Sequence, residues 1–424
     1  MPNFQTVRGM RDLLAEEVET LNFVFCKARE TAQLFGYREV ITPLVEPYKL
    51  LSAKSGEEIR QRMFTFKDLG NRTVALRPEF TASIARLATT TLKTEPKPLR
   101  VFSSGNVYRY DEPQRGRYRE FWQSNFELVG SDKPEADAET ILLTNNLMKG
   151  IGLQSYSFKI GHIGIIRGIL NQACIKDETQ NAILQLMDKK EYDKALKLVA
   201  EEKFQVVLHG LLELKGATPF ETLEKIKDFV DDYKEATAAA DNLLDILLLT
   251  DESGCPVEKV DPAFARGLEY YTGMIFEVNI PELDVALGGG GRYDKLIEVF
   301  GGEPTPAVGV AHGLDRIALA IQTQEIGLSK RQGIRVVVIP VHEKLRGEAI
   351  RIANTLREAG VIVEFEVMGR KIGKALEDAN KREMDYAVIV GKREMDENSV
   401  VVRDLAKHEQ TTVKICKLLE KLRG

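Results

Sequence analysis

Helical and strand periodicities alternate along the first part of the chain. Apolar residues recur at helical spacing over residues 11–35, which predicts a long helix. Residues 38–46 then read as a strand, and residues 62–76 as a hairpin whose turn lies near residues 69–71. A helix followed by a strand fits a packing or dimer element, and it fits an ordinary helix–strand unit equally well.

Residues 104–130 carry the most informative pattern, a strand, a basic loop and a second strand. Alternation along the second strand separates an apolar face (Trp122, Phe126, Leu128) from a polar face (Gln123, Asn125, Glu127). The loop holds Arg115, Arg117 and Arg119, and guanidinium groups match phosphate or carboxylate with two parallel hydrogen bonds. Two interpretations stay open here: a hairpin with a solvated charged tip, and a hairpin that binds an anionic ligand.

The remaining periodicity divides the chain into parts of different kinds. Residues 164–250 are helical throughout, with charged faces, and interrupt a sheet-containing region. The tail alternates strand and helix, ends in an expected helix over residues 410–422, and predicts a separate α/β domain on a mainly parallel sheet. We therefore expect a core in two parts, residues 1–163 and 251–322, separated by a helical insertion at 164–250. A linker at 323–333 and a tail domain at 334–424 follow.

Several isolated residues suggest a binding site. Glu79 stands where a helix begins, where a carboxylate either complements the helix dipole or receives a ligand's ammonium group. Arg266 precedes Tyr270 and Tyr271, which fits a binding wall or simple aromatic packing. The glycines at 288–291 allow a close backbone approach, although no P-loop lysine follows them. Arg316 near a helix start opposes the dipole preference, which suits a side chain that offers its charge to a ligand.

Composition narrows the class of protein. The 424 residues are 43% hydrophobic and 29% charged, enough for two or three domains, and no apolar run is long enough for a membrane helix. The net charge of −5 argues against indiscriminate nucleic-acid binding but allows a selective RNA partner. The four cysteines are scattered and form no metal motif with the five histidines, and the N-terminus lacks a signal-peptide pattern. We expect a cytoplasmic protein with no membrane or DNA partner.

Together these strings resemble the histidyl-tRNA synthetase family of class II aminoacyl-tRNA synthetases over nearly the whole chain. Residues 36–46 resemble class II motif 1, residues 108–121 motif 2 and residues 309–316 motif 3. More specific are Leu-Arg-Pro-Glu-Phe-Thr at 76–81, Arg-Gly-Leu-Glu-Tyr-Tyr at 266–271 and Gly-Gly-Gly-Gly-Arg-Tyr-Asp at 288–294. The resemblance implies an α+β catalytic core with a class II antiparallel sheet, an all-helical insertion and a C-terminal α/β anticodon-binding domain, assembled as a homodimer.

The resemblance also implies roles for individual residues. Histidine binding falls to residues on both sides of the core: Glu79, Thr81, Gln123, Glu127, Arg266, Tyr270 and Tyr271. Within that set Glu79, Thr81 and Gln123 hold the α-amino group, while Glu127 and Tyr271 read the imidazole. The ATP-binding residues are Arg109, Asp111 and Arg316, and the catalytic cations are Arg266, Arg109 and Arg316. Gln114, Arg115 and Arg117 meet the tRNA acceptor end.

The implied reaction is ATP-dependent ligation of L-histidine to tRNA-His through a histidyl-adenylate. ATP is a substrate accompanied by Mg²⁺, and we expect no tightly bound organic cofactor and no metal held by the protein itself. Asp111 stands where the family commonly has glutamate, and Glu112 is an alternative adenine contact. A catalytically inactive regulatory subunit, or a sensor of histidine or uncharged tRNA, is the alternative function. Such proteins usually lack the tail domain or have damaged signature motifs, and this chain shows neither feature.

Overall fold

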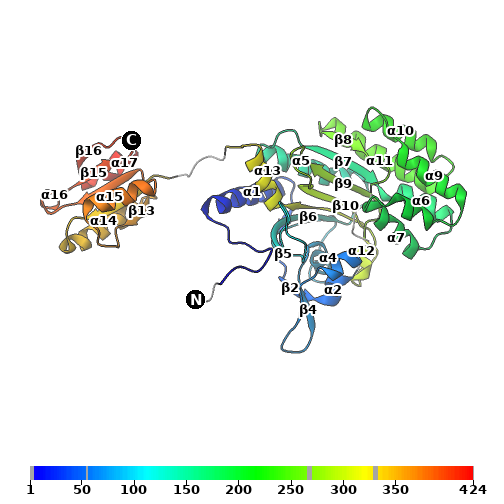
Figure 1. Ribbon diagram of the computed structural model, residues 1–424, viewed down its shortest axis with the longest axis horizontal. Helices are drawn as coiled ribbons and strands as arrows, with labels where there is room; N and C mark the ends of the chain where they lie inside the picture. Colours follow the sequence, from blue (N-terminus) through cyan, green and yellow to red (C-terminus); the bar gives the residue numbers. More distant parts are fainter. Residues whose placement is uncertain (1–3, 54–55, 265–269, 328–332, 424) are drawn as a thin grey trace. The chain divides into compact units, whose positions relative to one another are not determined.

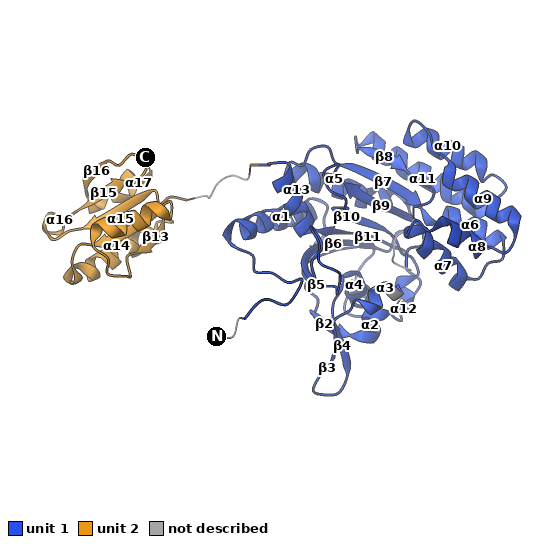
Figure 2. Cartoon of the chain, viewed as in Figure 1, with its two compact units in different colours: residues 1–326 blue, residues 327–424 orange. Residues whose placement is uncertain are grey.

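The computed structural model describes residues 4–53, 56–264, 270–327 and 333–423. The chain forms two compact units, Met1–Ile326 and Gly327–Gly424 (Figure 2). Arg266 and the rest of residues 265–269 lie outside the described residues. Within the described part, no helix combines the length and the apolar composition needed to cross a membrane.

An eight-stranded sheet forms the centre of the first unit, with the strand order β1-β5-β6-β11-β10-β9-β7-β8 (Figure 1). Neighbouring strands are antiparallel except for the β1–β5 and β7–β8 pairs at the two edges, which are parallel. In sheet order the strands are Arg38–Glu39, Leu99–Tyr108, Glu120–Val129, Ala307–Gly313, Gly288–Arg292, Met274–Asn279, Ser157–His162 and Val257–Val260. The expected class II antiparallel sheet is confirmed.

The paired strands β5 and β6 form the predicted hairpin, and they stay in register over ten residues each. The apolar face of β6 packs into the core, where Phe126 is fully buried against Tyr37 and Phe102. Helix α1 (Ala15–Leu34) covers this side, and its Phe25 meets Trp122 edge-to-face at 5.4 Å. Helices α5 (Pro134–Ile151) and α13 (Leu314–Thr323) both contact α1. The polar face of β6 is therefore left for the opposite side of the sheet.

A smaller sheet, ordered β2-β4-β3, and short helices accompany the main sheet near its β1–β5 edge. Its strands are Val45–Pro47, Thr73–Leu76 and Thr65–Lys67, and the helices are α2 (Tyr48–Ser52), α3 (Glu57–Gln61), α4 (Thr81–Thr89) and α12 (Leu296–Val299). The hairpin turn predicted near residues 69–71 is present, and Asn71 adopts a positive φ of 60° there. The strand expected over 38–46 is instead two short strands, β1 and β2, in different sheets. Helix α1 likewise begins at Ala15 rather than at residue 11.

A purely helical stretch follows β7, as the periodicity predicts. It comprises α6 (Ile163–Gln172), α7 (Asp177–Asp188), α8 (Tyr192–Lys197), α9 (Glu202–Glu213), α10 (Pro219–Phe229) and α11 (Lys234–Glu252). The long helix α11 packs against both α6 and the core helix α5. The insertion is thus attached to the core through its last helix as well as through the chain itself.

The second unit is built on a five-stranded sheet, ordered β13-β12-β14-β15-β16. Its strands, in that order, are Ile362–Phe365, Arg335–Pro340, Tyr386–Val390, Ser399–Asp404 and Gln410–Lys414. Its helices are η1 (Glu343–Leu345), α14 (Arg346–Glu358), α15 (Ile372–Lys381), α16 (Lys392–Asp396), η2 (Ile415–Lys417) and α17 (Leu418–Arg423).

Two expectations about this unit were wrong. The expected closing helix over 410–422 begins as strand β16, because Thr411, Thr412 and Val413 favour extended backbone and pair with β15. The sheet is mixed rather than mainly parallel, since β14–β15 and β15–β16 are antiparallel.

Candidate functional site

A cavity of about 250 Å³ lies in the first unit, on the polar side of β6. Its walls come from β6, the loop after β5, the glycine strand β10, strand β11 and the starts of α4 and α13. It brings together most of the side chains proposed from sequence: Glu79, Thr81, Arg109, Asp111, Arg117, Gln123, Glu127, Tyr270, Tyr271 and Arg316. Gln114 and Arg115 are exposed in the loop outside the cavity lining.

Glu127 is the most enclosed carboxylate of the cavity, with 1% of its surface exposed. It accepts hydrogen bonds from Thr81 Oγ1 at 2.7 Å, from Asn125 Nδ2 at 3.4 Å and from the Tyr293 hydroxyl. Burial raises its pKa to about 7, although these hydrogen bonds oppose the shift. A carboxylate so placed can accept an N–H from a ligand in a nearly water-free setting.

Glu79 is the second buried acid, positioned just before α4. Its Oε2 accepts a hydrogen bond from the Tyr270 hydroxyl at 3.0 Å, and burial raises its pKa while the nearby Arg109 lowers it. Tyr270 in turn stands edge-to-face with Tyr293 at 5.6 Å and close to Tyr271 at 5.0 Å. The three tyrosines form an aromatic wall beside the two carboxylates.

Gln123 supplies an unsatisfied acceptor to the same space. The side chain is buried, and its Oε1 has no hydrogen-bond partner among the described residues. Asn125 Oδ1 also has no partner among the described residues, but Asn125 does not line the cavity. A buried carbonyl without a donor is unfavourable by about 1–3 kcal/mol, so the Gln123 oxygen suits a ligand that brings N–H groups. An ammonium group between Gln123 and Glu79 would satisfy both.

Glycines form the floor of the cavity, because no other residue fits there. Gly309 in β11 lies opposite Glu127 in β6, and a Cβ added to Gly309 would lie 2.6 Å from Glu127 Cδ. In β10 a Cβ on Gly288, which also lines the cavity, would lie 3.0 Å from the Ala311 carbonyl oxygen. The close approach expected of the glycine run is therefore an approach of β10 to β9 and β11.

The other end of the cavity is cationic. Arg109 donates from Nε to the Pro78 carbonyl at 2.9 Å, and its guanidinium carbon lies 5.5 Å from the Phe121 ring centroid. Arg316 donates to the carbonyls of Gly116 at 3.1 Å and Ala286 at 2.8 Å. These contacts fix both side chains at their bases, so that positive charge faces a space suited to an anion.

The loop between β5 and β6 is ordered by its own hydrogen bonds. Gln114 and Arg117 form a two-bond bridge, with N···O distances of 3.1 and 2.8 Å. Arg115 and Arg117 are exposed, but Arg119 is not at a solvated tip: it is 4% exposed and donates to the Asp111 carbonyl at 3.1 Å. The interpretation of a solvated charged tip therefore holds for Arg115 and Arg117 but not for Arg119, and binding of an anionic ligand stays a prediction.

The two acidic candidates for the adenine contact differ in position. Asp111 lines the cavity, and Arg62 donates to its Oδ1 at 3.1 Å. The Glu112 side chain is 79% exposed, lies outside the cavity lining and pairs with Arg8 at 2.8 Å. The geometry favours Asp111 over Glu112.

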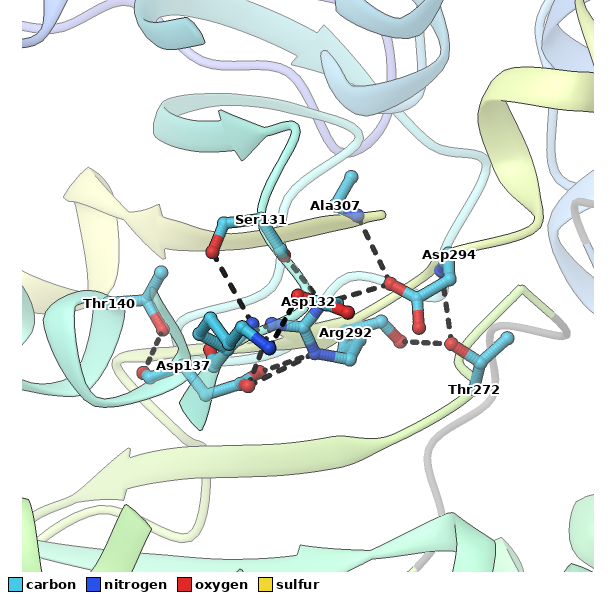
Figure 3. A network of polar contacts seen from close by, with 9 residues as sticks. Ser131, Asp132, Asp137, Thr140, Thr272, Arg292, Asp294 and Ala307 are labelled. Carbon is cyan, nitrogen blue, oxygen red and sulfur yellow. Dashed lines mark hydrogen bonds and ion pairs between the residues drawn. The ribbon is translucent and has the colours of Figure 1, made fainter. Parts of the chain in front are cut away.

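Arg292, the last residue of the glycine strand β10, is the centre of a polar network that joins this strand to α5 (Figure 3). Its guanidinium binds Asp137 on α5 through Nε at 3.0 Å and NH2 at 2.8 Å, and it binds Asp294 through NH1 at 3.0 Å. The Thr272 backbone N–H donates a hydrogen bond to the Arg292 carbonyl at 2.8 Å, which joins the chain after Tyr271 to the same network. Burial raises the pKa of Asp137 to about 6, and Arg292 opposes that shift. The network fixes the base of the segment that carries Tyr270 and Tyr271.

Comparison with known proteins identifies the family. A family model described as histidyl-tRNA synthetase matches residues 9–317, and a second model, described as an anticodon binding domain, matches residues 335–424. The chain belongs to the histidyl-tRNA synthetase family. A histidine–tRNA ligase of Methanocaldococcus jannaschii is 40% identical over 421 residues, covering 98% of both chains. That of Sulfolobus acidocaldarius is also 40% identical, covering 99% of this chain and 98% of its own.

Solved structures agree with this histidyl-tRNA synthetase assignment. A Bacillus halodurans structure described as an ATP phosphoribosyltransferase regulatory subunit/histidyl-tRNA synthetase is 27% identical with a TM-score of 0.75, covering 88% of this chain and 96% of its own. Apo histidyl-tRNA synthetase of Staphylococcus aureus superimposes over 100% of both chains with a TM-score of 0.76; at 24% identity it supports the fold alone. The full-length curated relatives named above are ligases, so nothing favours the regulatory alternative.

Tyr293, which donates a hydrogen bond to Glu127, is a site residue of this histidyl-tRNA synthetase that was not predicted from the sequence. The cavity residue Arg62 and the supporting residue Arg292 were not predicted either. Arg292 and Tyr293 could have been found from the sequence, since they directly follow the glycine run at 288–291. The sequence around Arg62 gave no indication of its role, because its contact with Asp111 joins distant segments.

Proposed function

We propose that the chain ligates L-histidine to tRNA-His in two steps, with ATP as the energy source and histidyl-adenylate as the intermediate. The main support for this proposal is that the two ends of the cavity differ. One end has buried hydrogen-bond acceptors and tyrosines, and the other has fixed arginines. Histidine fits the first end and the triphosphate the second. The membership of the chain in the family and its full-length ligase relatives support the same reaction.

At the amino-acid end we assign the α-ammonium group to Glu79, Thr81 and Gln123. Supporting this assignment, Glu79 and Thr81 lie at the start of α4, and Gln123 Oε1 has no donor among the described residues. We assign the imidazole to Glu127 and Tyr271, with Tyr270 beside them. A site that satisfies buried polar groups only with the right substrate can discriminate by about 10⁴ or more without editing.

At the nucleotide end we assign the α-phosphate to Arg109, and ATP binding more generally to Arg316 and Asp111. Activation joins a carboxylate to an α-phosphorus, so two anions must be brought together. The carboxylate is already ionised, so the site needs fixed positive charge rather than a general base. We assign that role to Arg109 and Arg316 here and, from its sequence position alone, to Arg266. Mg²⁺ enters with ATP, as part of that substrate.

The second step transfers histidine to the tRNA. We assign contact with the acceptor end to Gln114, Arg115 and Arg117, since all three are exposed on the loop that borders the cavity. We assign anticodon binding to the second unit, residues 327–424, on the strength of its family match. The core, insertion and tail boundaries proposed from sequence remain our working domain division.

We also propose a homodimer, formed through the motif 1 region. Large apolar side chains are exposed there, including Ile41 at 92% and Val45 at 41%, with Leu69 on the adjoining hairpin. An exposed cluster of this kind is typical of an interaction surface. We place the reaction in the cytoplasm, where the exposed thiols of Cys26, Cys174 and Cys416 would stay reduced.

The proposed function is tested by ATP–pyrophosphate exchange with each of the twenty amino acids in turn. We expect exchange with histidine alone. Charging of tRNA-His should follow at the same enzyme concentration. An absence of exchange with histidine would overturn the proposal and would revive the regulatory alternative.

A further inference from the structure

The residues before α1 bind the loop that borders the cavity. The Gly9 carbonyl accepts a hydrogen bond from the Arg119 backbone N–H at 2.8 Å. Gly9 has a φ of +85°, and an added Cβ would lie 2.7 Å from Arg119 Cγ. The contact therefore needs glycine, in both its backbone conformation and its lack of a side chain. This hydrogen bond between Gly9 and Arg119 also places Arg11 beside the same loop.

Arg11 joins that loop to α13. Its guanidinium carbon lies 3.6 Å from the centroid of the Tyr118 ring, and its NH2 donates to Asp315 Oδ1. The other carboxylate oxygen of Asp315 accepts from the Trp122 backbone N–H at 2.6 Å. Tyr118 and Asp315 both line the large cavity. One cation thus holds together the loop, the start of β6 and the first turn of α13.

Asp315 needs this partner more than a surface carboxylate would. Its side chain is 5% exposed, and burial raises its pKa, whereas Trp122 and Arg11 lower it. It stands directly before Arg316, which we assign to ATP. An unpaired negative charge there would oppose binding of a polyanion and would attract Arg316 away from it.

We infer that Arg11 is a positioning residue for the ATP half of the reaction: it neutralises Asp315 and fixes Tyr118, so that no unpaired negative charge opposes the nucleotide beside Arg316. The inference rests on the proposed function. It adds a residue that precedes all three class II motifs and that lies outside every site assigned above. Its effect should fall on ATP and not on histidine, because Arg11 contacts Tyr118 and Asp315. Glu79 and Glu127 are instead held by Tyr270 and Thr81.

Arg8 is a matched control in the same segment. It also pairs with an acid of the loop, Glu112, but the two side chains are 74% and 79% exposed. Exposed pairs of this kind contribute about 0–1 kcal/mol. Arg8→Met therefore removes an arginine and an ion pair without uncovering a buried charge.

The test measures histidine-dependent exchange at varied ATP and varied histidine for Arg11→Met, Arg11→Lys and Arg8→Met. We expect Arg11→Met to lower kcat/KM for ATP about tenfold with an unchanged KM for histidine, since one partner of a largely buried pair is lost. Arg11→Lys should recover most of the loss by restoring the charge. Arg8→Met should match the wild-type protein.

A double-mutant cycle with Asp315→Asn isolates the charge. Asparagine keeps an acceptor for the Trp122 N–H but needs no cation, so Arg11→Met should have little effect in that background. An equal loss in both backgrounds would overturn the inference, as would a parallel loss for ATP and histidine with a lowered melting temperature. Wild-type activity in Arg11→Met would overturn the inference alone. A wild-type protein without histidine-dependent exchange would overturn the proposed function, and the inference with it.

Discussion

Gly309→Ala should damage histidine recognition through a single added methyl group. The new Cβ would lie 2.6 Å from Glu127 Cδ and 2.8 Å from the Phe126 carbonyl oxygen, and it would lie nearer still to Glu127 Oε2. The Phe126 carbonyl belongs to β6, which pairs with β11 throughout this region, so it cannot retreat. The Glu127 carboxylate must move instead.

The expected loss of histidine binding follows from the contacts that Glu127 would lose when its carboxylate moves. Overpacking a filled site costs about 1–3 kcal/mol, and a hydrogen bond to a charged group is worth about 1.5–3 kcal/mol. Glu127 would have to give up its alignment with Thr81 and Tyr293, and with them its contact to the imidazole. A loss of about 3 kcal/mol in histidine binding corresponds to about a hundredfold rise in KM.

The assay is ATP–pyrophosphate exchange at varied histidine, with the ATP dependence and the melting temperature measured alongside. Gly313→Ala is the control on the same strand, because the three atoms nearest to its added Cβ belong to the Arg316 side chain, at 3.2 Å or more. It should leave the KM for histidine unchanged. A folded Gly309→Ala protein with the wild-type KM for histidine would refute the reasoning. If that variant melts early, Glu127→Gln tests the same contact without adding volume.

Three further predictions follow from the described geometry. Burial raises the pKa of Glu127 from 4.5 to about 7, so between these values the folded protein binds more protons than the unfolded one. The free energy of unfolding of the ligand-free protein should therefore fall as pH rises through this window, by about 3 kcal/mol relative to Glu127→Gln, as thermal melts at pH 5 and pH 8 can show. Truncation after Ile326 should leave amino-acid activation largely intact and abolish efficient tRNA charging, because each unit has its own sheet; equal loss of both activities would mean that the tail supports the core. Ile41→Glu should convert a dimer to monomers in sedimentation, and an unchanged mass would place the dimer contact elsewhere.

The predictable parts of this molecule are those whose signal is local. The period-2 alternation of β6 placed Gln123 and Glu127 on one face, and the structure puts both in the cavity. The helical period of residues 164–250 likewise predicted a helical insertion, and helices α6 to α11 lie there. In both cases the pattern repeats within a few residues, so neighbouring positions reinforce one another.

The missed features depend on contacts between distant segments. Tyr293 reaches Glu127 across 166 positions, and Arg11 reaches Asp315 across 304. No periodicity records such a pairing, because each partner is ordinary in its own surroundings. Strand β16 was missed for a related reason, since its pairing with β15 outweighs the helical appearance of the residues after it.

The glycine floor has a consequence for how this pocket can change. A wall of larger side chains can be trimmed or reshaped one substitution at a time, so a related amino acid can gain entry gradually. A floor of glycine has no side chain to shorten, and every replacement at Gly309 or Gly288 only fills the space. Laboratory libraries that seek a new substrate should therefore hold the floor constant and vary Gln123 and Tyr271, which both line the cavity. Natural drift in specificity would have to take the same route.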